Sequence, residues 1–277
     1  LKFGCVMIRE TYWTFRDRYN RGNDLVKQLY WKEFYANVTY HYPHILRGMV
    51  NSKKGNAPMR KSLEQALKWR SMKSKKSKRY FKKWCRGETG FPIVDAGMRQ
   101  MNCTGYMHNR LRMITSTFLM KDLHLDWRDG ERYFATRLVD YDPASNNGGW
   151  QWSAGTGTDS QPYFRIFNPW TQAKKFDKNC EYIKKWIPEL KSVPNKDIFK
   201  WYEKYEDYVY PRSSSKRKKH KSFESSSSES SSDDSDSTTD GDNNTNDNKY
   251  VHYFEPIVDH KQAAKYTLDK VYKGIKE

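Results

Sequence analysis

MHNRLRMITSTFLMKDL, residues 107–123, is the stretch that decides the fold class. Its apolar residues Leu111, Ile114 and Phe118 recur at spacings of three and four, which is the period of one face of a helix. Aromatic residues, Gly and Asn are dense around it, over residues 84–190. We therefore predict that this helix lies in the best-specified part of the core.

Residues 8–49, upstream of this stretch, show a similar pattern. Apolar side chains again recur at helical spacing, since Leu25 and Leu29 lie four residues apart and so do Phe34 and Val38, which is typical of amphipathic helices. The sequence has no evident alternation of apolar and polar residues and no internal repeat. It therefore predicts an all-α fold.

Two segments depart from this pattern. Residues 51–83 are dominated by Lys, Arg and Ser, and we predict a short helix there, followed by a solvated basic loop. DYDPASNNGGWQWSAGTGTD, residues 140–159, is rich in Gly and Asn, which permit backbone geometries that bulkier residues resist. We expect this second segment to form a loop that could hold a ligand closely.

A low-complexity segment interrupts the pattern near the C-terminus. Residues 212–249 consist mainly of Ser, Asp and Asn, with hardly an apolar side chain, so no core could offset the entropy of ordering them. We predict a disordered insertion over these residues. It would separate a helical domain over residues 1–211 from a final helix in residues 250–277 that completes this domain.

The charge balance favours a polyanionic partner. The sequence has 51 Lys and Arg against 33 Asp and Glu, a net charge of +18, which favours nucleic acid first and an anionic membrane surface second. No apolar run approaches the roughly 20 residues that span a bilayer, and the segment LKFGCVMIRE, residues 1–10, lacks the charged-then-apolar order of a secretory signal. We expect a soluble, intracellular protein, with KRKKHK at residues 216–221 as a weak signal for a nuclear or other DNA-containing compartment.

The four cysteines lack C-x-x-C spacing and predict no metal site.

Four segments carry a resemblance to a known family. They are QLYWKEFY (28–35), TGFPIVDAGMRQMNCTGYMHNRLRM (89–113), DWRDGERYFATRLVDYDPASNNGGWQW (126–152) and YFRIFNP (163–169). Together they resemble the helical FAD-binding domain of the DNA photolyase/cryptochrome family, and within it the class I cyclobutane pyrimidine dimer photolyases. The resemblance implies a multi-helix domain with FAD as cofactor. It also implies deoxyribodipyrimidine photo-lyase activity, in which blue light drives an electron to a flipped-out lesion.

Two details point to different branches of this family. MHNRLRM at residues 107–113 resembles the dimer photolyases, whereas Gln28 stands where their pattern has Glu and resembles the (6-4) and cryptochrome branch. An amide at this position can hydrogen-bond but supplies no negative charge. A cryptochrome-like light-signalling module and a repair-inactive DNA-binding module therefore stay open as alternatives.

For the flavin, the resemblance implies a polar set of contact residues. An ion pair of Arg112 and Asp140 is expected to orient the isoalloxazine edge, and Asn146 to hydrogen-bond flavin N5. Without the resemblance, the ion pair would be interpreted as an ordinary surface pair and Asn146 as a turn residue. The expected cofactor-binding residues are Asn109, Arg112, Asp140, Tyr141, Asp142 and Asn146.

For the lesion, the resemblance implies that Trp31 and Trp152 embrace the flipped-out dimer. Stacking contributes on the order of 1–3 kcal/mol per base, while the alternative for a single Trp is core packing. Basic residues between Lys53 and Lys83 would neutralise phosphates around the lesion. The expected lesion-binding residues are Gln28, Trp31, Lys32, Tyr35, Arg110, Met113, Trp152 and Gln172.

For electron supply, the resemblance implies a chain of tryptophans. Trp150 would lie nearest the flavin and Trp127 in the middle, with Trp69 as the outermost member. Tyr80 is an alternative for the outermost position, and a packing role for Trp69 stays open. The predicted catalytic residues are Trp150, Trp127, Trp69 and Asn146.

Family members also carry an N-terminal α/β domain that can hold an antenna chromophore. Residues 1–4 resemble the end of a segment that grips the flavin phosphates. We therefore expect that an antenna chromophore does not bind this chain. We expect that this chain lacks such a domain, and three explanations stay open. The chain is a fragment of a split enzyme, its N-terminal photolyase half is encoded separately, or it has lost repair activity. The expected partner is damaged double-stranded DNA, and no membrane is expected.

Overall fold

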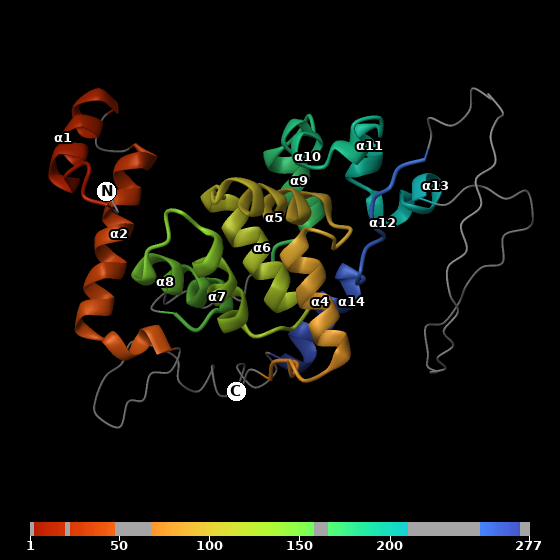
Figure 1. Ribbon diagram of the computed structural model, residues 1–277, viewed down its shortest axis with the longest axis horizontal. Coiled ribbons are helices and arrows are strands. Elements are labelled where there is room, and N and C mark those ends of the chain that lie inside the picture. The colour runs from red at the N-terminus through yellow and green to blue at the C-terminus, as the bar shows by residue number, and fades with distance from the viewer. Residues whose placement is uncertain (1–2, 20–22, 48–67, 158–165, 210–249, 272–277) are drawn as a thin grey trace, which may run out of the picture.

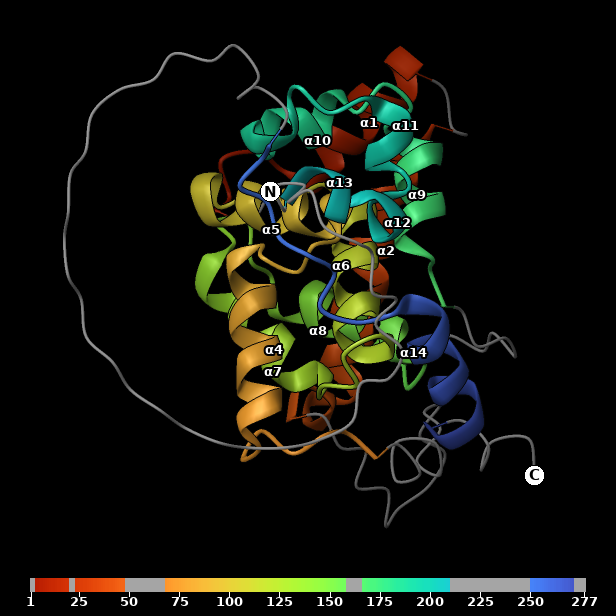
Figure 2. The ribbon, with the colours of Figure 1, turned by 90° about the vertical axis from the view of Figure 1, so that its right-hand side faces the viewer.

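The structure is a computed structural model that describes residues 3–19, 23–47, 68–157, 166–209 and 250–271. This part of the chain contains helices and loops and no strand, so the predicted all-α fold is confirmed. The predicted disordered insertion, residues 212–249, falls outside the described residues. The longer helices are α1 (Ile8–Tyr19), α2 (Asp24–His41), α4 (Lys75–Arg86), α5 (Pro92–Thr104), α6 (Asn109–Lys121), α7 (Trp127–Arg137), α8 (Pro143–Ala154) and α9 (Pro169–Phe176) (Figures 1 and 2). The shorter ones are η1 (Pro43–Arg47), α10 (Glu181–Trp186), η2 (Pro188–Leu190), α11 (Asn195–Ile198), α12 (Trp201–Lys204), α13 (Glu206–Val209), α14 (His260–Tyr266) and η4 (Thr267–Val271).

Helices α5 and α6 occupy the middle of the molecule (Figure 1). Helix α6 packs against α5, α7, α8 and α9. Its predicted apolar face is confirmed, because Leu111, Ile114 and Phe118 are all buried. Burying one such side chain contributes about 1.5–3 kcal/mol. The apolar face thus fixes the rotation of α6 and, with it, the direction in which its polar residues point.

Helix α8 replaces the loop that the sequence predicts over residues 140–159. The side chain of Asp142 caps its N-terminus by accepting a hydrogen bond from the Ser145 backbone N–H at 2.8 Å. A proline occupies the first turn, and Gly155 ends the helix with a φ of +77°. These start and stop signals are those of an ordinary helix. They outweigh the low helix propensity of the two internal glycines.

One of these glycines sets how closely α2 approaches α8. A Cβ atom on Gly148 would lie 2.2 Å from Cδ1 of Tyr35 on α2, whereas a Cβ on the adjacent Gly149 would meet nothing within 4 Å. Gly148 therefore lets the ring of Tyr35 lie directly on the α8 backbone. This contact brings α2 beside α8.

Helix α4 replaces part of the predicted basic loop. The apolar anchors of this segment are sparse but correctly spaced, because Ser77, Tyr80 and Trp84 are buried at spacings of three and four. Gly87 ends the helix with a φ of +66°. The short helix predicted before this loop lies mostly outside the described residues. Few apolar residues suffice for a helix when they fall on one face.

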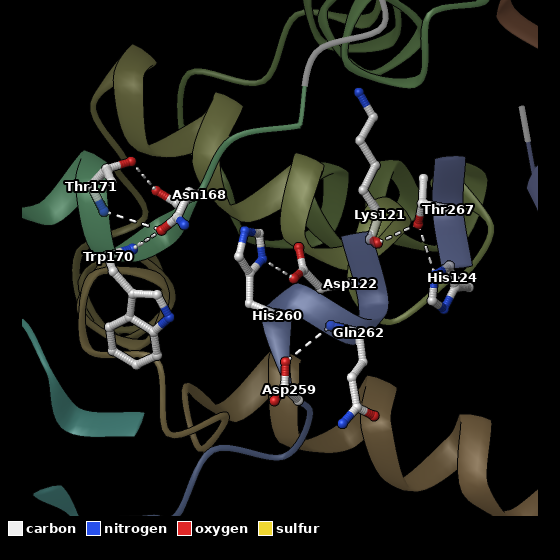
Figure 3. A network of polar contacts seen from close by, with 10 residues as sticks. All are labelled: Lys121, Asp122, His124, Asn168, Trp170, Thr171, Asp259, His260, Gln262 and Thr267. Carbon is white, nitrogen blue, oxygen red and sulfur yellow. Dashed lines mark hydrogen bonds and ion pairs between the residues drawn. The ribbon is translucent and has the colours of Figure 1, made fainter. Parts of the chain in front are cut away.

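The C-terminal segment returns to the body of the protein through buried polar contacts (Figure 3). Its helix α14 begins at His260 and not at Tyr250 as predicted, because Asp259 supplies the N-cap and the preceding residues form no helix. His260 Nδ1 lies 2.5 Å from the Asp122 carboxylate at the end of α6. In the following turn, the Thr267 hydroxyl donates to the Lys121 carbonyl at 2.7 Å. Burial raises the pKa of Asp122.

A second buried carboxylate holds the same C-terminal segment. Asp95 on α5 accepts hydrogen bonds from the backbone N–H groups of Thr89 and Gly90, each at 2.9 Å, and from the Tyr253 hydroxyl at 2.5 Å. Burial raises the pKa of Asp95 above its ordinary value. Two buried acids thus join the C-terminal segment to the central helices.

Over the described ranges, no helix combines the length and apolar character needed to cross a membrane.

Candidate functional site

A cavity of about 370 Å³ opens between α2, α6 and α8. Its volume lies within the roughly 300–1,000 Å³ typical of small-molecule sites. The walls combine aromatic side chains with amides, hydroxyls and charged groups. Such a mixture suits a flat, partly polar ligand whose edge makes hydrogen bonds.

Most of the predicted cofactor-binding residues line this cavity. Arg112 Nη2 donates to both carboxylate oxygens of Asp140, at 3.0 and 2.8 Å, and Arg112 Nε donates to the Met107 carbonyl at 2.7 Å. These contacts fix the guanidinium in one orientation at the cavity wall. The predicted residues on the wall are Asn109, Arg112, Asp140, Asp142 and Asn146.

Asn146 is held by a residue of the neighbouring helix. Its Nδ2 donates to Oε1 of Glu131 on α7 at 3.0 Å. The Tyr141 hydroxyl donates to the same carboxylate oxygen at 3.3 Å. An ionised carboxylate only accepts hydrogen bonds, so Glu131 selects the amide rotamer in which the Asn146 nitrogen faces α7. The amide oxygen is then the atom available to a ligand in the cavity.

Asp142 has two roles at the cavity wall. It caps α8, and its carboxylate lies 3.5 Å from the Lys32 ammonium on α2. Burial by itself raises the pKa of Asp142, but the hydrogen bonds from Ser145 and the charge of Lys32 outweigh it, so the pKa lies below its ordinary value. The ionised carboxylate therefore joins α2 to α8 across the cavity.

The predicted lesion-binding tryptophans lie on the same cavity. Trp31 is 52% exposed, which places it at the open side, and its ring stacks on Tyr35 with the centroids 6.2 Å apart. Trp152 comes from α8, opposite α2. The predicted lesion residues that line the cavity are Gln28, Trp31, Lys32, Tyr35, Met113 and Trp152.

Trp150 forms part of the inner wall. Its side chain is buried, and its ring centroid lies 5.0 Å from that of Phe134 and 6.2 Å from that of Trp84. A Cβ atom on Gly130 of α7 would lie 2.2 Å from Cη2 of Trp150. The absence of a side chain at Gly130 thus makes room for the indole.

The other predicted members of the electron-transfer chain lie away from the cavity. Trp127 is buried at the start of α7, and its Nε1 has no hydrogen-bond partner in the part of the chain that the structure describes. Trp69 is half-buried and packs against the core, while Tyr80 is buried on α4. The electron-transfer roles of these residues stay predictions.

Three further predicted site residues do not line the cavity. The Arg110 guanidinium lies over the ring of Phe176, 4.6 Å from its centroid. Tyr141 contacts Glu131, as described above. Gln172 on α9 has a buried Oε1 atom that lacks a hydrogen-bond partner within the described ranges.

The structure also adds residues that the sequence interpretation missed. Glu131 orients Asn146 through the packing of α7 against α8, for which the sequence holds no local signal. Hydroxyls on α6 and α8 contribute polar atoms to the wall, and the Ser116 hydroxyl donates to that of Ser153 at 3.0 Å. The unpredicted lining residues are Ser116, Phe134, Ser145, Gly149 and Ser153.

Comparisons with known proteins cover most of the chain. The family model described as "FAD binding domain of DNA photolyase" matches residues 25–273. The deoxyribodipyrimidine photo-lyase of Salmonella typhimurium is 46% identical over 196 residues, which cover 69% of this chain and 38% of that protein. The Escherichia coli deoxyribodipyrimidine photo-lyase is 47% identical over 186 residues, which cover 66% of this chain and 36% of that protein. The chain thus spans well under half the length of these two relatives.

Solved structures show the same likeness in three dimensions. An archaeal photolyase from Sulfolobus tokodaii, solved with two FAD molecules, matches with a TM-score of 0.69 and 35% identity, covering 97% of this chain and 48% of that one. A cryptochrome from Synechocystis matches with a TM-score of 0.69 and 26% identity, covering 97% of this chain and 47% of that one.

Proposed function

This chain belongs to the family of FAD-binding domains of DNA photolyases, and on that premise we propose that its cavity binds FAD and serves the blue-light-driven repair of cyclobutane pyrimidine dimers. The observation that carries the proposal is a shared location. Arg112, Asp140 and Asn146, which are predicted to contact the flavin, line the same cavity as Trp31 and Trp152, which are predicted to contact the lesion.

The residues of the cavity fit the isoalloxazine ring of FAD. The indole of Trp150 and the ring of Phe134 offer apolar surface to a flat heterocycle, and Asn146 offers an amide oxygen at the wall. The fixed guanidinium of Arg112 offers donors to a carbonyl edge. Bound FAD supplies the absorption of blue light and the electron that splits the dimer.

The protein residues position the reactants. Trp31 at the open side and Trp152 on α8 present indole faces on which unstacked bases can lie. Lys32, kept near Asp142 at 3.5 Å, brings a positive charge to the same side. Trp150 lines the cavity and contacts a second buried tryptophan, which supports its proposed role in passing an electron from the protein to the flavin.

A repair assay tests this proposal. Dimer-containing duplex DNA is illuminated with blue light in the presence of FAD and the chain, either alone or together with a candidate N-terminal photolyase half. We expect loss of dimers that depends on both light and FAD. Persistence of all dimers in both preparations would rule the proposal out.

A cryptochrome-like signalling function is the second candidate, and Gln28 is the observation that favours it. Gln28 lines the cavity and supplies a neutral amide where the dimer-repair pattern has a carboxylate. If the protein repairs dimers, Gln28→Glu should raise the number of dimers split per absorbed photon, since a carboxylate can share a proton with the lesion. Light-dependent binding of a protein partner, without repair in either variant, would support signalling instead.

A further inference from the structure

Helix α4 carries a concentration of positive charge that the proposed site does not use. Its sequence KKSKRYFKKWCR contains seven Lys or Arg and no Asp or Glu. Six of these seven basic residues are exposed, and Lys83 is half-buried. A charge run on a helix is often only a solvated face, so the arrangement and surroundings of these residues decide what the run can do.

The basic residues form a continuous row along the outer face of α4. Ser77, Tyr80 and Trp84 are buried and attach the opposite face of the helix to the core. With this rotation fixed, side chains three or four residues apart line up along the helix. Lys75, Arg79, Lys82 and Arg86 form such a row, about 16 Å long at a rise of about 1.5 Å per residue.

This row is not neutralised by the rest of the described protein. Elsewhere, the cations Arg99 and Arg112 pair with carboxylates at 2.8 Å. By contrast, no ion pair between α4 and an acidic side chain is found among the residues that the structure describes. Two lysines of α4 outside this row contact aromatic rings instead. The Lys76 ammonium lies near the ring of Tyr80, and the Lys83 ammonium lies near the ring of Phe254.

The outer face of α4 lies away from the cavity, because Trp84 on its opposite, buried face is the residue that contacts the lining residue Trp150. Figure 1 shows α4 and α2 on opposite sides of α6 and α7, and α4 packs on α5. None of residues 75–83 lines the cavity. The phosphates next to a base bound in the cavity do not account for this charge.

We propose that the outer face of α4 is a second contact surface for nucleic acid, which binds the phosphate backbone of duplex DNA independently of lesion and flavin. The face contains Lys and Arg but no exposed large apolar residue. A helix that binds an anionic membrane needs exposed apolar residues that enter the membrane interface. A specific protein partner generally needs large side chains that become buried at the centre of the interface. A phosphate backbone needs only the charge.

The salt dependence of binding to undamaged duplex, measured in the dark without FAD, tests this proposal. The variant is the quadruple Lys75→Gln, Arg79→Gln, Lys82→Gln and Arg86→Gln, in which Gln preserves helix propensity. The matched control removes the same charge from exposed lysines elsewhere, by Lys178→Gln, Lys191→Gln, Lys196→Gln and Lys200→Gln. Circular dichroism and thermal unfolding confirm that both variants are folded.

We expect the α4 variant to bind undamaged duplex more weakly and to reduce the slope of log K against log salt by about one for each lost phosphate contact. The control should keep most of the wild-type slope.

An unchanged slope in the α4 variant, or an equal loss in the control, would overturn the proposal. Loss of binding to anionic phospholipid vesicles with an unchanged duplex slope would assign the surface to lipid and also overturn it. Because no light, flavin or lesion is involved, failure of dimer repair leaves this test unaffected.

Discussion

The side-chain nitrogen of Asn146 donates a hydrogen bond to the carboxylate of Glu131, with 3.0 Å between Nδ2 and Oε1. The two residues come from neighbouring helices, α8 and α7, which pack against each other. The contact turns an amide that could adopt either orientation into one with a defined acceptor facing the cavity. It makes Glu131 a positioning residue for the proposed flavin site.

We predict that Glu131→Gln weakens FAD binding. A glutamine can donate as well as accept, so it no longer fixes the orientation of the Asn146 amide. Loss of one such hydrogen bond costs about 0.5–1.5 kcal/mol, and the dissociation constant for FAD should rise by about 2- to 10-fold. Fluorescence titration with FAD measures this change. Asp129→Asn on the same helix is the matched control, and an equal effect in the control would contradict the assigned role.

Trp152→Ala should lower the affinity for a DNA duplex that contains a pyrimidine dimer. The indole offers a stacking surface worth about 1–3 kcal/mol per base, so the dissociation constant should rise by roughly 5- to 150-fold. Binding to undamaged duplex should not change, because it does not place a base in the cavity. Trp13→Ala, which removes an exposed tryptophan on α1, is the control. Equal losses for damaged and undamaged DNA would argue against a lesion contact.

The glycine pair of α8 provides a test of the helix contact that shapes the cavity. Gly148→Ala should destabilise the protein by about 1–3 kcal/mol, because the new Cβ atom overlaps the Tyr35 ring. Gly149→Ala has space for its Cβ atom and should stabilise the protein by about 0.5–1 kcal/mol. Urea unfolding followed by circular dichroism measures both variants. Similar stabilities for the two would mean that α2 does not lie on α8 as described.

The stability of the protein should fall in mild acid because of His124. This residue is buried, and burial, followed by the charge of Arg70, lowers its pKa from 6.5 to about 4. Between these two pH values the unfolded chain binds a proton that the folded chain does not. The folded state therefore loses stability as the pH falls from 6.5 to 4, by about 3 kcal/mol over the whole interval.

The variant His124→Asn isolates this effect. Asn tolerates the positive φ of 59° at this position and can keep a hydrogen bond to Thr267. Urea unfolding at several pH values should show a flatter pH dependence in His124→Asn than in the wild type. His252→Asn, which changes an exposed histidine, is the control and should keep the wild-type pH dependence. An unchanged pH dependence in His124→Asn would contradict the assignment.

The sequence predicted the helices whose apolar residues are both frequent and periodic. The buried face of α6 follows directly from Leu111, Ile114 and Phe118. The sequence is misleading at α8, because its Gly and Asn residues favour a loop although Asp142 and Gly155 supply the capping signals of a helix. It failed at α4 for a related reason, since three buried residues on one face are enough to hold a helix in a very basic segment.

The candidate site shows a similar division. Residues that belong to the family pattern, such as Arg112, Asp140 and Asn146, were found from the sequence, and the structure places them on one cavity. Glu131 and Ser153 were not found, because their contribution depends on the packing of α7 and α6 against α8. A single sequence gives no measure of which helices pack side by side, and the direction in which the basic face of α4 points could not be predicted for the same reason.

Titration of the flavin-free chain with FAD, followed by absorbance and fluorescence, tests the central claim most directly. The account predicts saturation at one FAD per chain, with the Arg112→Ala variant weakened by at least about tenfold, since a charged hydrogen bond is worth about 1.5–3 kcal/mol. Arg128→Ala is the matched control, because Arg128 also pairs with an aspartate, at 3.0 Å, but does not line the cavity. No binding by the wild type, or equal binding by the wild type and Arg112→Ala, would contradict the claim that this cavity is a flavin site.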